Sequence, residues 1–191
     1  KYQIIFGLQD KNDPALPLVK QVIKEFCDYD ISCIVNTELH GTNHKVSNLI
    51  NMYPSIKHEY ILIADSDMHV SKKYLNRVME AFSDKKVGVI TCLYHGKTKG
   101  KITSKLNTMF INTWFLPSVL ISCAFQPMKY CLGATMIVKR SILNKIGGFE
   151  SLSNHLADDY ILGKLISSLG YKIHLSDYIV ENIVEETSLE I

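Results

Sequence analysis

The sequence predicts an α/β fold in which a mainly parallel central sheet is flanked by helices. Short apolar runs of strand-forming residues alternate along the chain with segments whose apolar residues recur at helical spacing. Acidic residues follow the first and third apolar runs closely, at Asp10 and at Asp65 and Asp67. Because ligands bind at the carboxyl ends of the strands in such sheets, these positions indicate a binding site.

Two kinds of segment support this fold class. Apolar runs that end in polar or turn residues are expected to be strands, at 2–8, 31–35, 61–64, 87–93, 136–139 and 171–175. Segments with apolar residues at helical spacing are expected to be helices, at 18–26, 46–52, 74–82, 141–146 and 158–169. Proline marks some of the boundaries, because Pro14 and Pro17 stand at the start of the first helix and Pro54 follows the second. Gly147 and Gly148 are expected to end the helix before them.

Length and composition narrow the class of protein. The chain has 191 residues, which suits one domain with its own core over residues 1–191. Its formal net charge of +2 is too small to indicate a nucleic-acid-binding protein. The five cysteines include no CxxC pair, which indicates reduced, mostly buried thiols on the cytosolic side rather than a disulfide or zinc framework.

Residues 106–125 form an uncharged stretch that contains the single tryptophan, Trp114. Its length would be enough to cross a bilayer. Polar residues within it and the central Pro117 argue against a membrane span. We expect a helix that lies in the membrane interface, and a helix packed in the protein core is the alternative. Lysines 97, 99, 101 and 105 precede the stretch and either contact anionic headgroups or belong to a solvated loop.

Asp65 and Asp67 carry the strongest functional signal. An acidic pair of this kind also occurs in solvated turns, where aspartate caps the next segment. Here the pair ends an apolar strand, where two carboxylates repel each other unless a positive charge lies between them. Hard oxygen ligands at such a point suit magnesium or manganese, with substrate phosphates completing the coordination.

Four further residues, at three places in the chain, allow a functional interpretation. Asp10 follows the first strand, where it would accept an N–H from a pyrimidine ring. Lys45 follows Asn43 in a glycine-led loop, where it would neutralise a diphosphate beside the backbone N–H groups of a helix start. Asp158 and Asp159 open a helix, where acidic residues complement the helix dipole whatever the function. The functional alternative is that one of them acts as a general base, its pKa raised by the other carboxylate.

Six segments, in order, resemble the ceramide glucosyltransferase family, whose bacterial relatives include hopanoid-biosynthesis-associated glycosyltransferases. They are QDKNDPA, GTNHKVSNL, ADSDMHV, VGVITCLYHG, LGATMIVKRSILNKIGGFE and LADDYILGKLISSLGYKIHLS, and they cover nearly the whole chain. The resemblance implies a GT-A fold that uses a divalent metal and a UDP-sugar. The family pattern also includes a strand before Tyr2 and a Q/R-x-x-R-W motif after the base, which residues 1–191 do not contain. We therefore expect these residues to be an excised catalytic core.

The resemblance also assigns roles to single residues. It implies that Asp10 contacts uracil, and that Lys45 and Asp158 bind the nucleotide-sugar. Asp65 and Asp67 would hold the metal and the diphosphate, with Asp67 as the main ligand. Asp159 would be the catalytic base. The acceptor pocket would be lined by Gly133 and Ala134, with Trp114 nearby.

The expected reaction is the transfer of a hexose from UDP-glucose or UDP-N-acetylglucosamine to the hydroxyl of a ceramide- or diacylglycerol-like lipid, with inversion at the anomeric carbon. It would take place on the cytosolic face of a membrane. Two alternatives stay open: a transferase of the same fold that acts on a polysaccharide or soluble acceptor, and an inactive nucleotide-sugar-binding fragment. A P-loop or dinucleotide-binding protein is excluded, because the sequence contains neither GxxxxGK nor GxGxxG.

Overall fold

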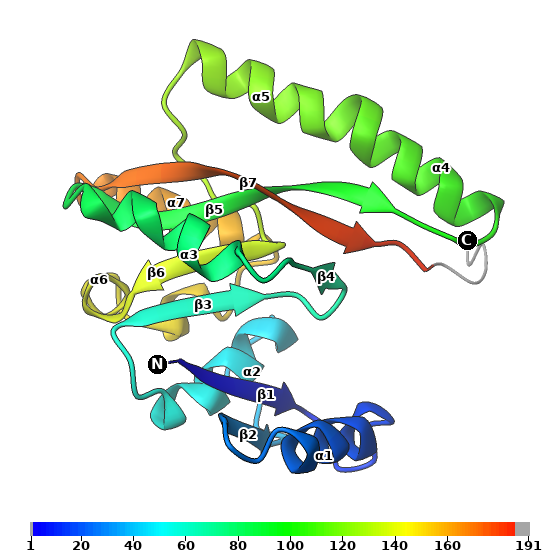
Figure 1. Cartoon of the computed structure of the whole chain (residues 1–191). Helices are drawn as coiled ribbons and strands as arrows, with labels where there is room; N and C mark the ends of the chain where they lie inside the picture. The colour runs from blue at the N-terminus through cyan, green and yellow to red at the C-terminus, as the bar shows by residue number, and fades with distance from the viewer. Residues whose placement is uncertain (1, 186–191) are drawn as a thin grey trace. The chain divides into compact units, whose positions relative to one another are not determined.

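The computed structural model describes residues 2–185 and divides them into two compact units. Unit 1 comprises residues 2–61 and 139–161, and unit 2 comprises residues 62–138 and 162–185. The α/β class predicted from the sequence is confirmed. Figure 1 shows the order of the elements along the chain.

Unit 1 begins with a strand, helix, strand sequence. β1 (Gln3–Leu8) and β2 (Asp30–Val35) pair in parallel, with Gln3 opposite Asp30 and Leu8 opposite Val35. The connection contains α1 (Ala15–Glu25), as a parallel pair requires a crossover. α2 (His44–Met52) leads into a 3₁₀ turn at Tyr53–Ser55. Asn48 on α2 donates a hydrogen bond to the carbonyl of Gly7, 2.9 Å away, which fixes α2 against β1.

The second stretch of unit 1 contains α6 (Arg140–Lys145), a 3₁₀ turn at Phe149–Leu152, and the first residues of α7 (Asp158–Ser168). α6 ends at Gly147 and Gly148, whose φ angles of +93° and +72° favour glycine, as the sequence predicts. The ring of Phe149 meets that of Tyr53 edge to face at 5.8 Å. This contact joins the two stretches of unit 1.

Unit 2 is built on a five-stranded sheet in the order β3-β6-β5-β7-β4. The strands are β3 (Tyr60–Ala64), β4 (Met68–His69), β5 (Val87–Lys97), β6 (Thr135–Lys139) and β7 (Lys172–Ile183). β7 runs parallel to β5, whereas β6 is antiparallel to β5 and β4 is antiparallel to β7. Strand directions in this sheet are therefore mixed, and the last strand extends well beyond the expected 171–175.

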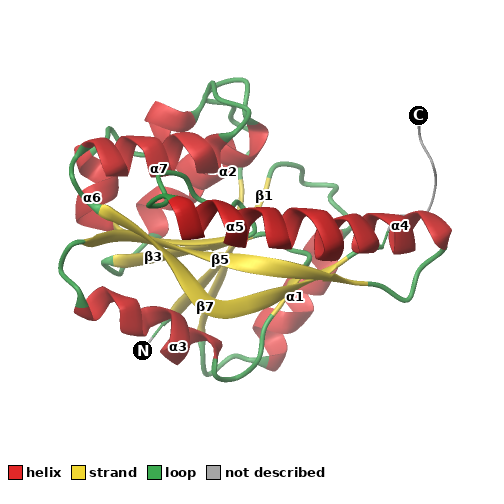
Figure 2. Ribbon diagram, turned by 90° about the horizontal axis from the view of Figure 1, so that it is seen from above, coloured by secondary structure: helices red, strands yellow, loops and turns green. Residues whose placement is uncertain are grey.

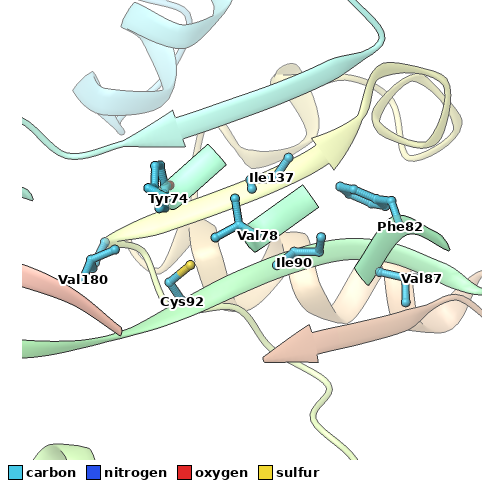
Figure 3. Close-up of a cluster of buried hydrophobic side chains, with 9 residues drawn as sticks. Tyr74, Val78, Phe82, Val87, Ile90, Cys92, Ile137 and Val180 are labelled. Carbon is cyan, nitrogen blue, oxygen red and sulfur yellow. The ribbon is translucent and has the colours of Figure 1, made fainter. Parts of the chain in front are cut away.

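One face of the sheet packs against α3 (Tyr74–Met79), which continues as a 3₁₀ turn at Glu80–Ser83. Figure 3 shows the buried cluster formed by side chains of this segment and of the strands: Tyr74, Val78, Phe82, Val87, Ile90, Cys92, Ile137 and Val180. Burial raises the pKa of the Cys92 thiol to about 11, so this cysteine stays protonated. None of the five cysteines, which all lie in the described part of the chain, forms a disulfide.

Another face carries a continuous helix from Ile102 to Phe125, formed by α4 (Ile102–Phe110), a π-helical turn (Ile111–Phe115) and α5 (Leu116–Phe125). Figures 1 and 2 show it lying along β5 and β7. Gly96 permits close approach, because a Cβ there would lie 3.2 Å from the backbone of Thr108. Asn112 exchanges two hydrogen bonds with the backbone of Gly96, at 2.8 and 3.0 Å. Pro117 lies inside this continuous helix, directly after the π-helical turn, and its missing N–H removes one backbone hydrogen bond there.

A buried hydroxyl tests how the loop before β6 is held. Thr91 donates to the carbonyl of Leu132 at 3.0 Å and accepts from the N–H of the same residue at 2.9 Å. Thr91→Val keeps the shape but leaves both buried backbone groups without this partner, so we expect unit 2 to lose about 1–3 kcal/mol of unfolding free energy. Urea denaturation measures the change. Ser118→Ala removes an exposed hydroxyl and is the control, expected within about 0.5 kcal/mol of wild type. An equal effect of the two substitutions would contradict the role of Thr91.

Candidate active site

The two acidic residues Asp65 and Asp67 lie in a tight turn between β3 and β4. The N–H of Asp65 donates to the carbonyl of Ala134 at 3.2 Å, and the carbonyl of Asp65 accepts from the N–H of Met68 at 3.3 Å. Asp65 is half-buried and Asp67 is exposed. The turn therefore presents the second carboxylate to solvent directly after a largely buried strand.

The end of β7 closes this turn from the other side. β4 pairs with β7 so that Met68 lies opposite Asn182. The N–H of Ile183 donates to the carbonyl of Asp67 at 2.9 Å. The side-chain amide of Asn182 donates to Oδ2 of Asp67 at 2.7 Å. Both the backbone and the carboxylate of Asp67 are thus held by β7.

A pocket of about 630 Å³ opens at this turn. Its lining comes from the turn, from α4 and from the end of β7: Ser66, Asp67, Met68, His69, Asn107, Asn182, Ile183, Val184 and Glu185. Within residues 2–185 no group of three or more acidic, histidine or cysteine side chains is arranged to hold a metal ion. A carboxylate pair beside an open pocket fits magnesium or manganese, because these ions take few protein ligands and complete their coordination with water and phosphate oxygens.

A charged cluster lies beside this pocket. Glu181 on β7 accepts from Nζ of Lys97 at 3.1 Å, and its other oxygen lies 3.0 Å from Nδ1 of His69, which lines the pocket. The hydrogen bond from Lys97, with His69 in support, holds the pKa of Glu181 below its ordinary value. Lys97 is therefore paired with Glu181, although it is exposed like lysines 99, 101 and 105.

In unit 1 the loop before α2 is tied to the start of α7. Asn43 caps α2 by accepting from the N–H of Val46 at 3.1 Å. Its amide nitrogen donates to the carbonyl of His155 at 2.7 Å and lies 3.3 Å from Oδ1 of Asp158. Gly41 is required nearby, because a Cβ there would lie 2.4 Å from the carbonyl oxygen of Ser153. These contacts bring the start of α2 and the start of α7 together.

The two neighbouring aspartates of α7 have different surroundings. Asp158 is buried, and burial raises its pKa, with a smaller contribution from the charge of Asp159; Lys45 and the hydrogen bond from Asn43 oppose the rise. Asp159 is half-buried and accepts from the N–H of Tyr160 at 2.7 Å. The sequence interpretation that one carboxylate of this pair has a raised pKa therefore applies to Asp158, with burial as the main cause.

The remaining predicted site residues are placed as follows. Asp10 is exposed, and its Oδ1 accepts from the N–H of Asn12 at 2.8 Å, which fixes the side chain in a local turn. Gly133 is half-buried and Ala134 is buried in the core cluster, where its carbonyl meets the turn at Asp65. Trp114 is 68% exposed on the long helix.

The structure thus brings Asp65, Asp67 and Ala134 together in unit 2, and Lys45 and Asp158 together in unit 1. Three polar side chains were not singled out from the sequence as site residues. Asn182 and Asn107 contribute to the pocket at Asp67, and Asn43 binds Asp158. The helix-capping position of Asn43 was a usable signal, whereas Asn107 and Asn182 are linked to Asp67 by tertiary contacts alone.

The raised pKa of Asp158 predicts how stability depends on pH. A folded-state pKa above the unfolded value means that the folded protein binds the proton more tightly, so this residue lowers stability as pH rises through the raised pKa. Asp158→Asn should therefore raise the melting temperature at about pH 8 and give little change at about pH 4, as measured by thermal unfolding.

Asp84→Asn is the matched control, because hydrogen bonds from Lys86 and Lys172 hold the pKa of Asp84 below its ordinary value. It should lower the melting temperature at the higher pH, the opposite sign. A loss of stability in Asp158→Asn that is equal at both pH values would contradict the assignment.

Comparison with known proteins gives the family. All of residues 1–191 match the family model of glycosyl transferase family 21. Ceramide glucosyltransferase 3 and ceramide glucosyltransferase 1 from Caenorhabditis elegans are each 24% identical, over 179 and 178 residues, which are 93% of this chain. The chain spans 39% and 38% of the length of these two relatives.

Two solved structures resemble the fold. The mannosyltransferase PcManGT from Pyrobaculum calidifontis, in complex with GDP-Man and Mn²⁺, has a TM-score of 0.69 and 17% identity over 94% of this chain and 47% of its own. GalNAc-T7 with UDP, GalNAc and Mn²⁺ has a TM-score of 0.66 and 10% identity over 96% of this chain and 38% of its own. The predicted GT-A fold is confirmed by these two structures. On the match over its whole length, the chain belongs to glycosyl transferase family 21.

Proposed function

We propose that this chain is the catalytic core of a glycosyltransferase that moves a hexose from a UDP-sugar to the hydroxyl of a lipid, with inversion, at the cytosolic face of a membrane. The names of the C. elegans relatives support glucose as the sugar and ceramide as the lipid class. The Mn²⁺ and the nucleotides present in the two similar structures support a divalent metal and a nucleotide-sugar donor.

One observation carries the proposal. The pocket at Asp67 is lined by Asn107, and Asn107 lies on the long helix that exposes apolar side chains to solvent. Its sequence neighbour Leu106 is 55% exposed, and Phe110, one turn further on, is 56% exposed. The pocket at Asp67, which would hold a metal-bound diphosphate, and an apolar surface suited to a lipid thus share a single helix. A transferase with a soluble acceptor would have no use for the apolar half of this arrangement.

For the donor, we assign Asp65 and Asp67 to the metal and diphosphate. When bound, magnesium or manganese supplies positive charge that stabilises the leaving diphosphate. Asp10 would accept an N–H from uracil, because its carboxylate is exposed and its orientation is fixed by Asn12. Lys45 at the start of α2 and Asp158 at the start of α7 would bind the nucleotide-sugar, and the backbone N–H groups at the start of α2 favour anions.

For the transfer step, Asp159 would take the proton from the lipid hydroxyl. At the same time the hydroxyl oxygen would bond to the anomeric carbon, and the bond from that carbon to the diphosphate oxygen would break. A single displacement of this kind inverts the configuration. Gly133 and Ala134 would line the acceptor pocket, since Ala134 adjoins the turn at Asp65. Trp114 would contact the lipid from the long helix.

The long helix supports a position on the membrane surface. By length and composition it could cross a bilayer, and only 11% of its most apolar 18-residue stretch is buried within the protein. Its inner face packs on β5 through Ile111 and Phe115, and a span would carry the polar edges of that sheet into the hydrocarbon. Lying in the interface instead, the helix buries its outer apolar face in the membrane and leaves the sheet in water.

Two substitutions separate donor binding from transfer. Asp67→Ala removes the main metal ligand, so the Mn²⁺-dependent UDP affinity should fall strongly. The loss should exceed the roughly 10–100-fold that is typical when a residue hydrogen-bonded to a metal ligand is removed. Asp159→Asn should keep that affinity, because the base acts on the acceptor. Isothermal titration of UDP with and without Mn²⁺ measures both. UDP affinity that is unchanged in Asp67→Ala would refute the metal assignment.

Vesicle binding tests the membrane surface. Phe110 and Trp114 are 56% and 68% exposed, and burying two such side chains contributes roughly 1.5–3 kcal/mol each. Phe110→Ser combined with Trp114→Ser should therefore weaken binding to phosphatidylcholine–phosphatidylserine vesicles by at least about tenfold, measured by co-sedimentation.

Leu18→Ser is the control, since Leu18 is 65% exposed on α1, away from the long helix in sequence, and should leave vesicle binding unchanged. Wild-type protein that stays in the supernatant, or equal losses in both variants, would exclude this helix as the membrane-binding surface.

A further inference from the structure

Asn182 is a polar side chain at a position where the strand pattern calls for an apolar one. Along β7 and its continuation, Val180, Asn182 and Val184 alternate on one face and are 0%, 9% and 6% exposed. A buried amide lowers stability unless it is hydrogen-bonded, and valine would fit the pattern better. Packing therefore does not explain the amide at this position, and its hydrogen-bond partner has to be considered.

The partner of this amide is the carboxylate of Asp67, 2.7 Å from Nδ2 to Oδ2. An ionised carboxylate accepts hydrogen bonds and donates none, so the nitrogen of the amide faces it and the amide oxygen points elsewhere. A hydrogen bond to a charged acceptor is stronger than one between neutral groups. It restrains one oxygen of Asp67 without neutralising the carboxylate, whose charge both oxygens share, so Oδ1 can still bind a ligand in the pocket.

The backbone supports the same geometry. Met68 pairs with Asn182, and the N–H of Ile183 donates to the carbonyl of Asp67 at 2.9 Å. These bonds fix the main chain at both residues, and the burial of Asn182 restricts the rotamers of its side chain. Asp67 itself is exposed, and an exposed aspartate without such a contact samples several rotamers.

We propose that Asn182 is a positioning residue that holds Asp67 in the rotamer required to bind the metal and diphosphate. This inference rests on the proposed function, because it takes Asp67 as the main metal ligand. Removing a residue that hydrogen-bonds to a metal ligand typically lowers the metal affinity by roughly 10–100-fold.

The test compares two substitutions at Asn182 with one elsewhere on β7. Asn182→Leu keeps the approximate shape and removes the donor, and Asn182→Gln keeps the amide but moves it by one methylene. Ser176→Ala is the control, because Ser176 is also buried, on the same strand, and accepts from the N–H of Tyr178 without touching Asp67. UDP affinity is measured by titration calorimetry with and without Mn²⁺, and the melting temperature is recorded for each variant.

Asn182→Leu should lower the Mn²⁺-dependent UDP affinity by roughly 10–100-fold and leave the metal-independent affinity unchanged. Asn182→Gln should fall between the leucine variant and wild type. Ser176→Ala should bind as wild type, whatever its melting temperature. A change in affinity that follows the melting temperature across the three variants would show that Asn182 is merely structural, and would overturn the inference.

The two levels of the proposal fail differently. If Asp67→Ala loses Mn²⁺-dependent binding while Asn182→Leu and Asn182→Gln bind as wild type, the positioning role is wrong and the metal assignment stands. If wild-type protein binds UDP equally with and without Mn²⁺, the metal assignment fails and the role of Asn182 fails with it.

Discussion

The pairing of β7 with both β5 and β4 is the constraint on which the acidic turn depends. β7 runs parallel to β5 over most of its length and pairs at its end with the two residues of β4. A two-residue strand has too few hydrogen bonds to hold a conformation by itself. The acidic turn is fixed because the end of β7 supplies a backbone donor, the N–H of Ile183, and a side-chain donor, the amide of Asn182, to Asp67. β7, which pairs with β5 along most of its length, therefore stabilises the turn that carries the exposed carboxylate of Asp67.

The long helix Ile102–Phe125 meets two different requirements with its two faces. Ile111 and Val119 are buried toward the sheet, and the paired hydrogen bonds between Asn112 and Gly96 fix the helix in register. The apolar side chains on the outer face contribute nothing to this packing, and leaving them in water is unfavourable. A sequence selected for the stability of a free, water-soluble domain would place polar residues there. The composition of the outer face is therefore explained by a partner outside the chain, and the packing face explains why the helix stays on the sheet.

The sequence predicted the fold better than the site, for a physical reason. Strands such as β1 and helices such as α2 were found within a few residues, because hydrophobic periodicity is a local signal. β4 was missed because two residues after a turn carry no periodicity. The second half of β7 was missed because Ser176 and Asp177 interrupt the apolar pattern, close to where the pairing with β5 shifts register. The acidic residues were proposed as site residues from their position after a strand. Their partner Asn182 was not, because the two are 115 residues apart and meet through strand pairing.

Asp158 and Asp159 show how the fold gives different environments to identical neighbours. Successive residues of a helix point about 100° apart, so one side chain turns inward when the next turns toward the surface. Asp158 is buried against the start of α2, where Asn43 and Lys45 offset part of the cost of burying its charge. Asp159 is half-buried and bound to the backbone beside it. A carboxylate that must accept a proton from a substrate has to be reachable, and one that fixes two helix ends has to be enclosed. The greater exposure of Asp159 therefore agrees with the role proposed for it as the base, whereas the buried Asp158 fixes the loop before α2.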